Sequence, residues 1–373
     1  MPNLLFCLTP GGSLSQWDKM GTLERELLLY RDYSRMGWKI RILSFGRESS
    51  FDLNLPEGIT VVNYPHARLL PLLPFLRQDL GKWADVIKSN QSTGSWHYVK
   101  AANRWNKPII LRCGYVTGRN LELEMGRTAK VILYQKKEAS AFANATRVHV
   151  TTSLLSEWVQ DHYHIDSDKI SVQPNFVDTE LFAPKNHAKK LPNSVVSIGR
   201  LHPVKRFSML IESCSKAGVQ TLTIIGAGPE HLLLKDMAFK CNLNVVFTGQ
   251  IANNQIPEIL SKHEMYAQIS QFEGHPKSLI EAMSCALPCL VSNTPGLSDQ
   301  IEHNVTGLIT ESTIESITEG LAWIMNKKSL AHNMGSRARE QIINTMEYSK
   351  IRDIELSVLN RLVDKKTSTQ SYL

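Results

Sequence analysis

The feature that most limits the possible folds is an alternation between two kinds of apolar pattern. Runs of four to seven apolar residues alternate with stretches whose apolar residues recur at helical spacing. Short apolar strands separated by helices are typical of α/β domains with a parallel sheet. The strands expected in the first half are residues 4–8, 39–45, 60–62, 85–89, 109–112 and 147–151, with a long amphipathic helix over 22–36. Those expected in the second half are residues 194–198, 220–225, 244–248, 265–269, 288–291 and 307–309.

The alternation is interrupted once, over residues 173–194 (QPNFVDTELFAPKNHAKKLPNS), where prolines, asparagines and lysines indicate a linker. A chain of 373 residues is also about twice the usual domain length. We therefore predict two domains, residues 1–185 and 186–345. A helical stretch in residues 346–373 has no strand partner and could pack back on the first domain. Each domain should offer its strand-to-helix loops to a cleft between them.

The composition excludes several classes of protein. An apolar share of 42% and a charged share of 21% exclude a disordered chain, and no apolar run approaches the roughly 20 residues that span a bilayer. The start MPNLLFCLTPGG does not resemble a secretory signal, so we expect a cytoplasmic protein. The six cysteines have neither disulfide nor zinc spacing and are expected to be buried thiols.

The net charge of +7 and pI of about 9.0 favour an anionic partner. Nucleic acid, a phosphorylated small molecule and an anionic membrane surface all fit this charge. The chain has no array of aromatic and basic residues of the kind that single-stranded nucleic acid requires, so we do not expect it to bind nucleic acid.

Two loops after expected strands have features of phosphate sites. In TPGGS, Gly11 and Gly12 let the backbone approach an anion, and the helix beyond should present unpaired N–H groups. The G-x-G-x-x-G spacing is absent, and a plain tight turn fits this loop equally. In GRLHPVKRF, Arg200 and Lys205 lie near the start of a helix, where they could bind a diphosphate. A solvated basic turn also fits these two residues.

The segment QFEGHPKSLIEAM is the most informative. Pro276 suits the first turn of a helix, whose open N–H groups can bind hydroxyls or phosphate. Eight residues at about 1.5 Å each separate Glu273 and Glu281 by on the order of 10 Å. Paired glycosidase carboxylates are about 5–9.5 Å apart, so these two acids are expected to hold different hydroxyl groups of one long ligand. A solvated acid on a capped helix is the alternative for Glu281.

Several motifs occur in a recognisable order: GRLHPVKRF, GAGPE, TGQI, EGHPKSLIEAM and NTPGLSDQIEHNVTGLI. Together with the hinge-like PNFVDTELFAP, they resemble the nucleotide-sugar half of glycosyltransferase family 4. In the first half the resemblance is looser and rests on the Gly-Gly loop and TRVHVTTSLLSEWV. It implies a GT-B fold of two Rossmann-like domains. It also implies a retaining, metal-independent hexosyltransferase that uses a nucleoside-diphosphate sugar as donor and no cofactor.

By position, the resemblance assigns Arg200 and Lys205 to the donor diphosphate and Glu273 to hydroxyls of the transferred sugar. These three are the expected catalytic residues. The remaining expected donor-binding residues are Gly11, Gly12, Gly249, Ile251, Gly274, His275, Pro276, Lys277, Ser278, Leu279 and Glu281.

Within that set, Glu281 would hold the ribose hydroxyls, and Gly249 and Ile251 would lie beside the base. The chain departs from the family after the expected strand at 109–112. Many relatives carry a histidine there, whereas this sequence has Arg112, Cys113, Gly114 and Tyr115.

The segment HARLLPLLPFLRQDLGKW (residues 66–83) bears on the acceptor. Its leucines could enter a membrane interface while Arg68, Arg77 and Lys82 meet anionic lipid, although a packed loop and helix fits as well. We expect a saccharide or lipid-linked saccharide acceptor of surface polysaccharide or glycolipid synthesis, with peripheral contact at the inner face of the plasma membrane. A sugar-nucleotide epimerase of similar build and a non-catalytic nucleotide-sugar-binding subunit are the alternatives.

Overall fold

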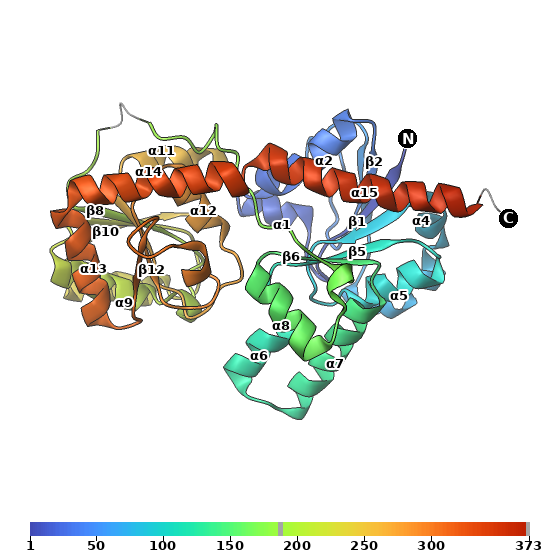
Figure 1. Cartoon of the computed structure of the whole chain (residues 1–373), viewed down its shortest axis with the longest axis horizontal. Helices are drawn as coiled ribbons and strands as arrows, with labels where there is room; N and C mark the ends of the chain where they lie inside the picture. The colour runs from blue at the N-terminus through green and yellow to red at the C-terminus, as the bar shows by residue number, and fades with distance from the viewer. Residues whose placement is uncertain (186–188, 371–373) are drawn as a thin grey trace. The chain divides into compact units, whose positions relative to one another are not determined.

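The computed structural model describes residues 1–185 and 189–370, which divide into two compact units (Figure 1). The first unit comprises Met1–Pro174 and the chain from Arg352 onward, and the second comprises Asn175–Ile351. The chain therefore leaves the first unit before residue 185, the predicted boundary.

The early boundary has a local cause. The backbone N–H of Asn175 donates to His275 Nδ1 at 3.3 Å, and Val177 forms a parallel bridge with Glu347. These contacts attach the start of the predicted linker to the second unit. Residues 173–185 and 189–193 contain neither a helix nor a regular strand, and the rest of that linker, residues 186–188, lies outside the described residues.

The first unit contains a parallel sheet of seven strands within the described residues, in the order β3-β2-β1-β4-β5-β6-β7. The strands are β1 Asn3–Cys7, β2 Lys39–Ser44, β3 Ile59–Asn63, β4 Val86–Ser89, β5 Ile109–Cys113, β6 Arg147–Val150 and β7 Ile170–Val172. The helices, with η for 3₁₀, are α1 Leu14–Lys19, α2 Leu23–Arg35, η1 Ala67–Leu72, α3 Leu73–Leu76, α4 Gln78–Trp83, α5 Trp96–Arg104, α6 Thr117–Met125, α7 Ala129–Asn144, α8 Ser153–Tyr163 and η2 Ser167–Lys169.

The second unit has a parallel sheet of six strands in the part of the chain that is described, in the order β10-β9-β8-β11-β12-β13. Its strands are β8 Ser194–Ile198, β9 Thr221–Ile225, β10 Asn244–Gly249, β11 Met265–Gln268, β12 Cys289–Ser292 and β13 Leu308–Thr310. The helices are η3 Pro203–Lys205, α9 Phe207–Ala217, α10 His231–Lys240, η4 Asn253–Gln255, α11 Ile256–Ser261, α12 Lys277–Ser284, η5 Ser298–Gln300, α13 Ile314–Asn326 and α14 Lys328–Thr345, followed by α15 Tyr348–Gln370.

The second sheet is buried on both faces, because successive side chains of a strand point to opposite sides. In β8, Val195 joins one apolar cluster and Val196 the other. In β12, Leu290 joins the first cluster, whereas Cys289 and Val291 join the second. This explains why the strands read as continuous apolar runs in the sequence.

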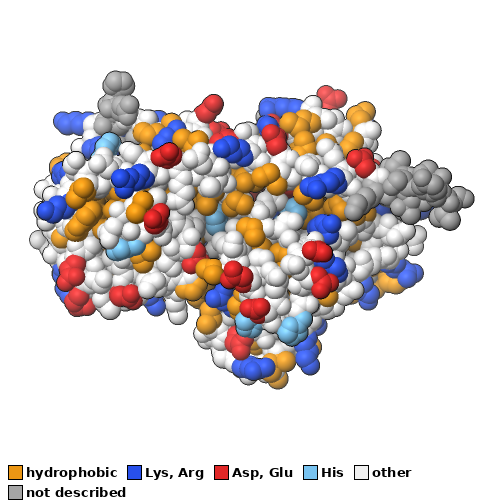
Figure 2. All heavy atoms as spheres, viewed as in Figure 1, with side chains coloured by type: hydrophobic (Ala, Val, Ile, Leu, Met, Phe, Trp, Pro, Cys, Tyr) orange, Lys and Arg blue, Asp and Glu red, His pale blue; other side chains and the backbone are white. Residues whose placement is uncertain are grey.

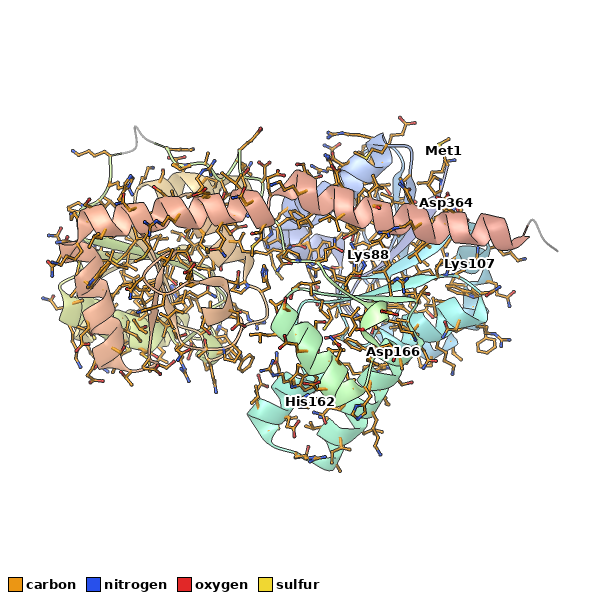
Figure 3. The ribbon with its side chains drawn as sticks, viewed as in Figure 1. Met1, Lys88, Lys107, His162, Asp166 and Asp364 are labelled. Atoms are coloured by element: carbon orange, nitrogen blue, oxygen red, sulfur yellow. The ribbon has the colours of Figure 1, made fainter. Side chains whose placement is uncertain are left out.

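From Arg352 onward, α15 packs on the first unit. Glu355 of this helix forms a buried ion pair with Lys88 of β4, the residue labelled in Figure 3. Glu355 also accepts a hydrogen bond from Gln173 Nε2 at 2.5 Å. At the start of the same segment, Arg352 pairs with Asp32 of α2 at 3.0 Å. A buried charge pair therefore fixes the last helix to the first sheet.

Each of the twelve predicted strands overlaps an observed strand. Two of the elements that were not predicted are an edge strand and a short helix. The strand β7 has only three residues, none of them fully buried, and α1 has a single buried residue, Leu14. Neither is long or apolar enough to produce a recognisable period. Among the described residues, we find no helix with the length and apolar character needed to cross a membrane.

Candidate active site

A connected group of polar side chains in the second unit lies where its strand order reverses. The strands β8 and β11 are neighbours, while the chain continues from β8 to β9 on the other side. Ligands of open α/β sheets bind at such a switch point, outside the carboxyl ends of the strands. The loop after β8 carries Lys205, and the loop after β11 carries Glu273. The two loops are joined by a hydrogen bond from Gln271 N to Val204 O at 2.8 Å.

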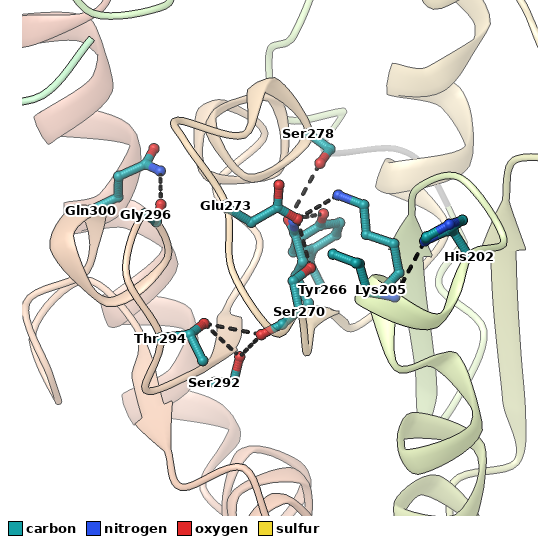
Figure 4. Close-up of polar contacts among 12 residues, drawn as sticks. His202, Lys205, Tyr266, Ser270, Glu273, Ser278, Ser292, Thr294, Gly296 and Gln300 are labelled. Atoms are coloured by element: carbon teal, nitrogen blue, oxygen red, sulfur yellow. Dashed lines mark hydrogen bonds and ion pairs between the residues drawn. The ribbon is translucent and has the colours of Figure 1, made fainter. Parts of the chain in front are cut away.

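The carboxylate of Glu273 is the centre of this group (Figure 4). It forms an ion pair with Lys205, and it accepts hydrogen bonds from Gln268 Nε2 at 2.8 Å and from Ser270 Oγ at 2.6 Å. All three donors reach Oε1. The side chains of Lys205 and Glu273 are 20% and 13% exposed, so the pair is held in place and still meets solvent.

Gln268 connects this carboxylate to the next helix. Its Oε1 accepts from Tyr266 Oη at 2.7 Å and from Ser278 Oγ, in the first turn of α12, at 3.3 Å. Burial raises the pKa of Tyr266 well above its usual range, so its hydroxyl stays a donor. Tyr266 and Ser278 therefore fix the orientation of Gln268, and Gln268 in turn orients Glu273.

A neighbouring loop closes against the backbone of Glu273. Gly296 has a φ of +84°, and a Cβ atom there would lie 2.3 Å from the carbonyl oxygen of Glu273 and 2.6 Å from that of Gly274. Gln300 Nε2 donates to Gly296 O at 2.5 Å, and Thr294 Oγ1 donates to Ser270 O at 3.1 Å (Figure 4). Only glycine permits this approach of the two loops.

Arg200 lies at the same edge of the sheet, two residues beyond β8. Its side chain is exposed and has no ion pair with any residue of the described ranges. The turn that carries it is supported by Gly226 and Gly228 of the motif GAGPE. A Cβ at Gly226 would lie 2.0 Å from Gly199 O, and one at Gly228 would lie 2.3 Å from Leu201 O. These two glycines thus let the loop after β9 support the loop of Arg200.

The start of α12 follows Glu273 directly. Pro276 is the N-cap, there is no side-chain cap, and the first turn contains no acidic residue. The N–H groups of Ser278 and Leu279 in this turn are not capped by a side chain and can donate to an anion. The side chains of the two flanking residues point elsewhere. His275 is buried, with its carbonyl bound by Asn175 Nδ2, and Lys277 Nζ lies 5.9 Å from the centre of the Phe176 ring.

Glu281 lies one turn further along α12 and has different partners from Glu273. It is 2% exposed and accepts a hydrogen bond from Asn253 Nδ2 at 2.9 Å. Asn253 begins η4, just after Gly249 and Ile251. The structure thus brings Glu281 close to the loop predicted to lie beside the base. Gly249 has a φ of +70° and open space where a side chain would be, whereas Ile251 packs against the apolar core, as does Leu279.

In the first unit, Gly11 and Gly12 lie at the other switch point, between β1 and β4. Gly11 has a φ of +86° and is exposed, and Gly12 N closes a turn on Thr9 O at 2.8 Å. The expectation that a helix presents unpaired N–H groups here is wrong. The helix that follows is the six-residue α1, and its first N–H, from Leu14, donates to Glu48 Oε1 at 3.0 Å.

Sequence reasoning missed a set of polar residues around the loops after β4 and β5. Gln91 Oε1 accepts from Gly114 N at 2.9 Å, and the hydroxyls of Thr93 and Thr117 are 2.6 Å apart. Glu138 of α7 is fully buried and accepts from the backbone N–H of Gly118 at 2.8 Å. A single Glu in an amphipathic helix gives no sign of burial, so the sequence offered no signal for this contact.

Two family profiles together match most of the chain. Residues 27–181 match the profile "Glycosyltransferase Family 4", and residues 178–341 match "Glycosyl transferases group 1". The chain belongs to glycosyltransferase family 4. The two profiles meet at residues 178–181, close to the division between the two units.

Curated relatives in this family are similar over parts of their length. One is the UDP-Gal:α-D-GlcNAc-diphosphoundecaprenol α-1,3-galactosyltransferase of Escherichia coli, 26% identical over 62% of this chain and 66% of that protein. Another is the N-acetyl-α-D-glucosaminyl L-malate synthase of Bacillus anthracis, 24% identical over 54% of this chain and 56% of that protein. The match thus spans between about half and two thirds of these relatives.

Solved structures establish the fold. HepE of Anabaena in complex with UDP superposes with a TM-score of 0.77 at 16% identity, covering 97% of this chain and all of that chain. Sucrose-phosphate synthase of Thermosynechococcus elongatus gives a TM-score of 0.80 at 17% identity, covering 98% of this chain and 100% of that chain. The predicted GT-B fold, with two parallel-sheet α/β domains, is confirmed.

Proposed function

We propose that this family 4 member transfers a hexose from a nucleoside-diphosphate sugar to a saccharide or lipid-linked saccharide, with retention of the anomeric configuration and without a metal ion or cofactor. The observation that carries the proposal is the Lys205–Glu273 pair, held at a sheet switch point beside the uncapped start of α12. A cation, an oriented carboxylate and backbone donors are what a diphosphate joined to a sugar requires.

In the proposed reaction, the bond between the anomeric carbon and the diphosphate oxygen breaks while the acceptor hydroxyl forms the new glycosidic bond. The largest developing charge is on the leaving phosphate, so Arg200, Lys205 and the first N–H groups of α12 supply most of the stabilisation. Because the donors on Glu273 all reach Oε1, Oε2 is the oxygen that we assign to a sugar hydroxyl. For retention, the acceptor attacks the face that the phosphate leaves, and that phosphate takes the acceptor proton.

Glu281 and the turn at Gly249 are assigned to the nucleoside of the donor. The acceptor is assigned to the first unit, in surface polysaccharide or glycolipid synthesis at the cytoplasmic face of the membrane. The Escherichia coli relative, whose name specifies a diphosphoundecaprenol-linked acceptor, supports this choice.

The first experiment screens the purified chain against UDP, GDP, ADP and CMP by thermal shift, because a bound nucleotide stabilises by mass action. The matching sugar nucleotides are then incubated with diphospholipid-linked saccharides, with and without EDTA, and the anomer of the product is determined by NMR. Transfer with retention in EDTA is the expected result. Donor consumed without an acceptor would indicate an epimerase, and nucleotide binding without turnover would indicate a non-catalytic subunit.

The variant Lys205→Met tests the assigned cation. We expect turnover to fall by about 100-fold, the effect of removing one preorganised charge-stabilising group, with an unchanged melting temperature. The control is Lys216→Met, which removes an exposed helical ion pair of α9. Wild-type turnover in Lys205→Met would remove this residue from the mechanism.

A further inference from the structure

A basic groove lies on the first unit, between α5 and α7. It encloses about 550 Å³, and it is lined on one side by Trp96 and Lys100 and on the other by Lys136 and Lys137. The ammonium group of Lys137 lies 5.9 Å from the centre of the Trp96 ring. Burial and the charges of Lys137 and Lys100 lower the pKa of His97, which also lines the groove. The lysines on its two sides are therefore close enough to act on one group.

The charge of the two helices is unbalanced. Over much of the face drawn in Figure 2, basic and acidic side chains are interspersed, so a net charge of +7 defines no patch by itself. In contrast, every exposed charged residue of α5 and α7 is basic, and none of them pairs with an acid among the described residues: Lys100, Arg104, Lys130, Lys136 and Lys137. The one acid of these helices, Glu138, is fully buried.

An apolar ridge adjoins the groove. In η1 and α3, Leu72, Phe75 and Leu76 are 48%, 50% and 57% exposed, although Leu73 between them is buried in the core. Pro71 of the same segment lines the groove. The guanidinium of Arg104 lies 4.4 Å from the centre of the Phe75 ring, which joins the basic helix to the ridge.

This arrangement changes the prediction made for residues 66–83. The leucines do face outward, but Arg77 is paired with Asp79 at 2.8 Å. Arg68 and Lys82 are exposed and form no ion pair within the described ranges, and further unpaired cations come from α5 and α7. Exposed leucines alone would suit a protein partner, whereas apolar side chains beside a groove with no acid suit the apolar core and the phosphates of a lipid layer.

We propose that the α5–α7 groove and the ridge of residues 69–76 form a binding surface for an anionic phospholipid bilayer. The proposal rests on the proposed function, because it specifies how a lipid-linked acceptor reaches the first unit. The helix α5 begins directly after the loop that follows β4, at the carboxyl edge of the sheet. A lipid surface bound along α5 would therefore hold an acceptor headgroup next to that edge.

The test is flotation of the full chain with phosphatidylcholine vesicles that contain either no phosphatidylglycerol or 30% phosphatidylglycerol (about one lipid in three). We expect binding to the anionic vesicles alone, and release as salt shortens the Debye length to about 3 Å at 1 M. A triple glutamine variant of Lys100, Lys136 and Lys137 should bind about 100-fold more weakly, at about 1 kcal/mol for each cation near the surface. The matched control carries the same change at exposed lysines of the second unit, Lys216, Lys240 and Lys262.

The apolar ridge is tested separately. The double variant Leu72→Ser and Leu76→Ser should lose about tenfold in vesicle affinity through lost apolar burial. Its control is Leu232→Ser with Leu233→Ser, which removes exposed leucines of α10. Equal losses in the test and control variants would overturn the proposal, since overall charge or stickiness would then explain the binding. The proposal would also be overturned by a wild-type chain that self-associates but does not float with vesicles, if the double variant Leu72→Ser and Leu76→Ser no longer self-associates.

The two proposals fail in different ways. A chain that floats with anionic vesicles but never uses a sugar nucleotide would remove the proposed function and leave the membrane surface. A chain that glycosylates a water-soluble acceptor but does not bind anionic vesicles at low salt would remove the membrane surface and leave the glycosyltransferase activity.

Discussion

Neutralising one member of the buried Lys88–Glu355 pair should destabilise the first unit strongly. Both residues are 1% exposed, and the Lys88 ammonium also lies 5.2 Å from the centre of the Tyr30 ring. The variant Glu355→Gln preserves the shape of the side chain and removes its charge. The cost is therefore that of an unpaired buried ammonium, about 3–5 kcal/mol, with no cavity to add to it.

The double variant Lys88→Met with Glu355→Gln distinguishes charge from packing. If the cost of the single variant comes from the uncompensated charge, removing both charges should restore most of the stability. The control is Lys262→Met, which breaks an exposed pair with Glu258 at 2.7 Å and should change stability by less than about 1 kcal/mol.

Denaturant unfolding followed by tryptophan fluorescence measures this effect selectively. Six of the seven tryptophans lie in the first unit, at positions 17, 38, 83, 96, 105 and 158, so the signal follows the unit that contains the pair. The reasoning would be refuted if Glu355→Gln cost less than about 1 kcal/mol, or if the double variant were as unstable as the sum of the two single variants.

The pH dependence of this pair has a defined sign. Burial acts to raise the pKa of Glu355, but the charges of Lys88 and His149 outweigh it, so the pKa lies below its usual value. The carboxylate therefore stabilises the fold above the ordinary carboxyl range, and this contribution is lost as the pH falls through the lowered pKa. The variant Glu355→Gln should lack this part of the acid loss.

Three further predictions concern single sites. Gly296→Ala should lower turnover by about 100-fold, because its Cβ would displace the Glu273 backbone, whereas Gly126→Ala, with a positive φ but no atom within 4 Å, should leave the rate unchanged in the same transfer assay. Glu281→Gln should weaken nucleotide binding by about 1.5–3 kcal/mol in calorimetry, and unchanged affinity would refute its ribose role. Burial lowers the pKa of His149 to about 4. Protonation of this residue in the unfolded chain should therefore make the free energy of unfolding about 2–3 kcal/mol smaller at pH 4.5 than at pH 7. The variant His149→Gln should lack this part of the pH dependence in denaturant unfolding at the two pH values.

The sequence predicts the strands well because both sheets are parallel and their central strands are buried. In the second unit, Ser194–Ile198 is observed with the predicted bounds. A buried parallel strand needs an uninterrupted apolar run, and such a run is visible without any knowledge of its neighbours. The edge strand β7 has no fully buried residue, so it lacks that signal.

The candidate site was less predictable, because its parts are joined by contacts between distant segments. The sequence identifies Lys205 and Glu273 as chemically suitable, but it does not show that they form a pair 68 residues apart. The roles of Gln268, the last residue of β11, and Asn253, the first residue of η4, were missed for the same reason, since nothing in the sequence shows which distant group each amide contacts. Glu138 shows the opposite error, a residue that reads as solvated helix surface but is buried against the start of α6.

The same structural device recurs at three pairs of adjacent loops. A glycine in the loop after one strand packs against the backbone or the proline ring of the loop after the adjacent strand. The three pairs are Gly94 with Pro10, Gly226 with Gly199, and Gly296 with Glu273. Adjacent strands are only about 4.8 Å apart, so loops that leave them at the same edge must either diverge or touch without a side chain between them. At these positions they touch. These glycines bind no ligand themselves but determine where the neighbouring loops lie. Replacing one of them by alanine should therefore lower turnover as much as removing a charged side chain of the site.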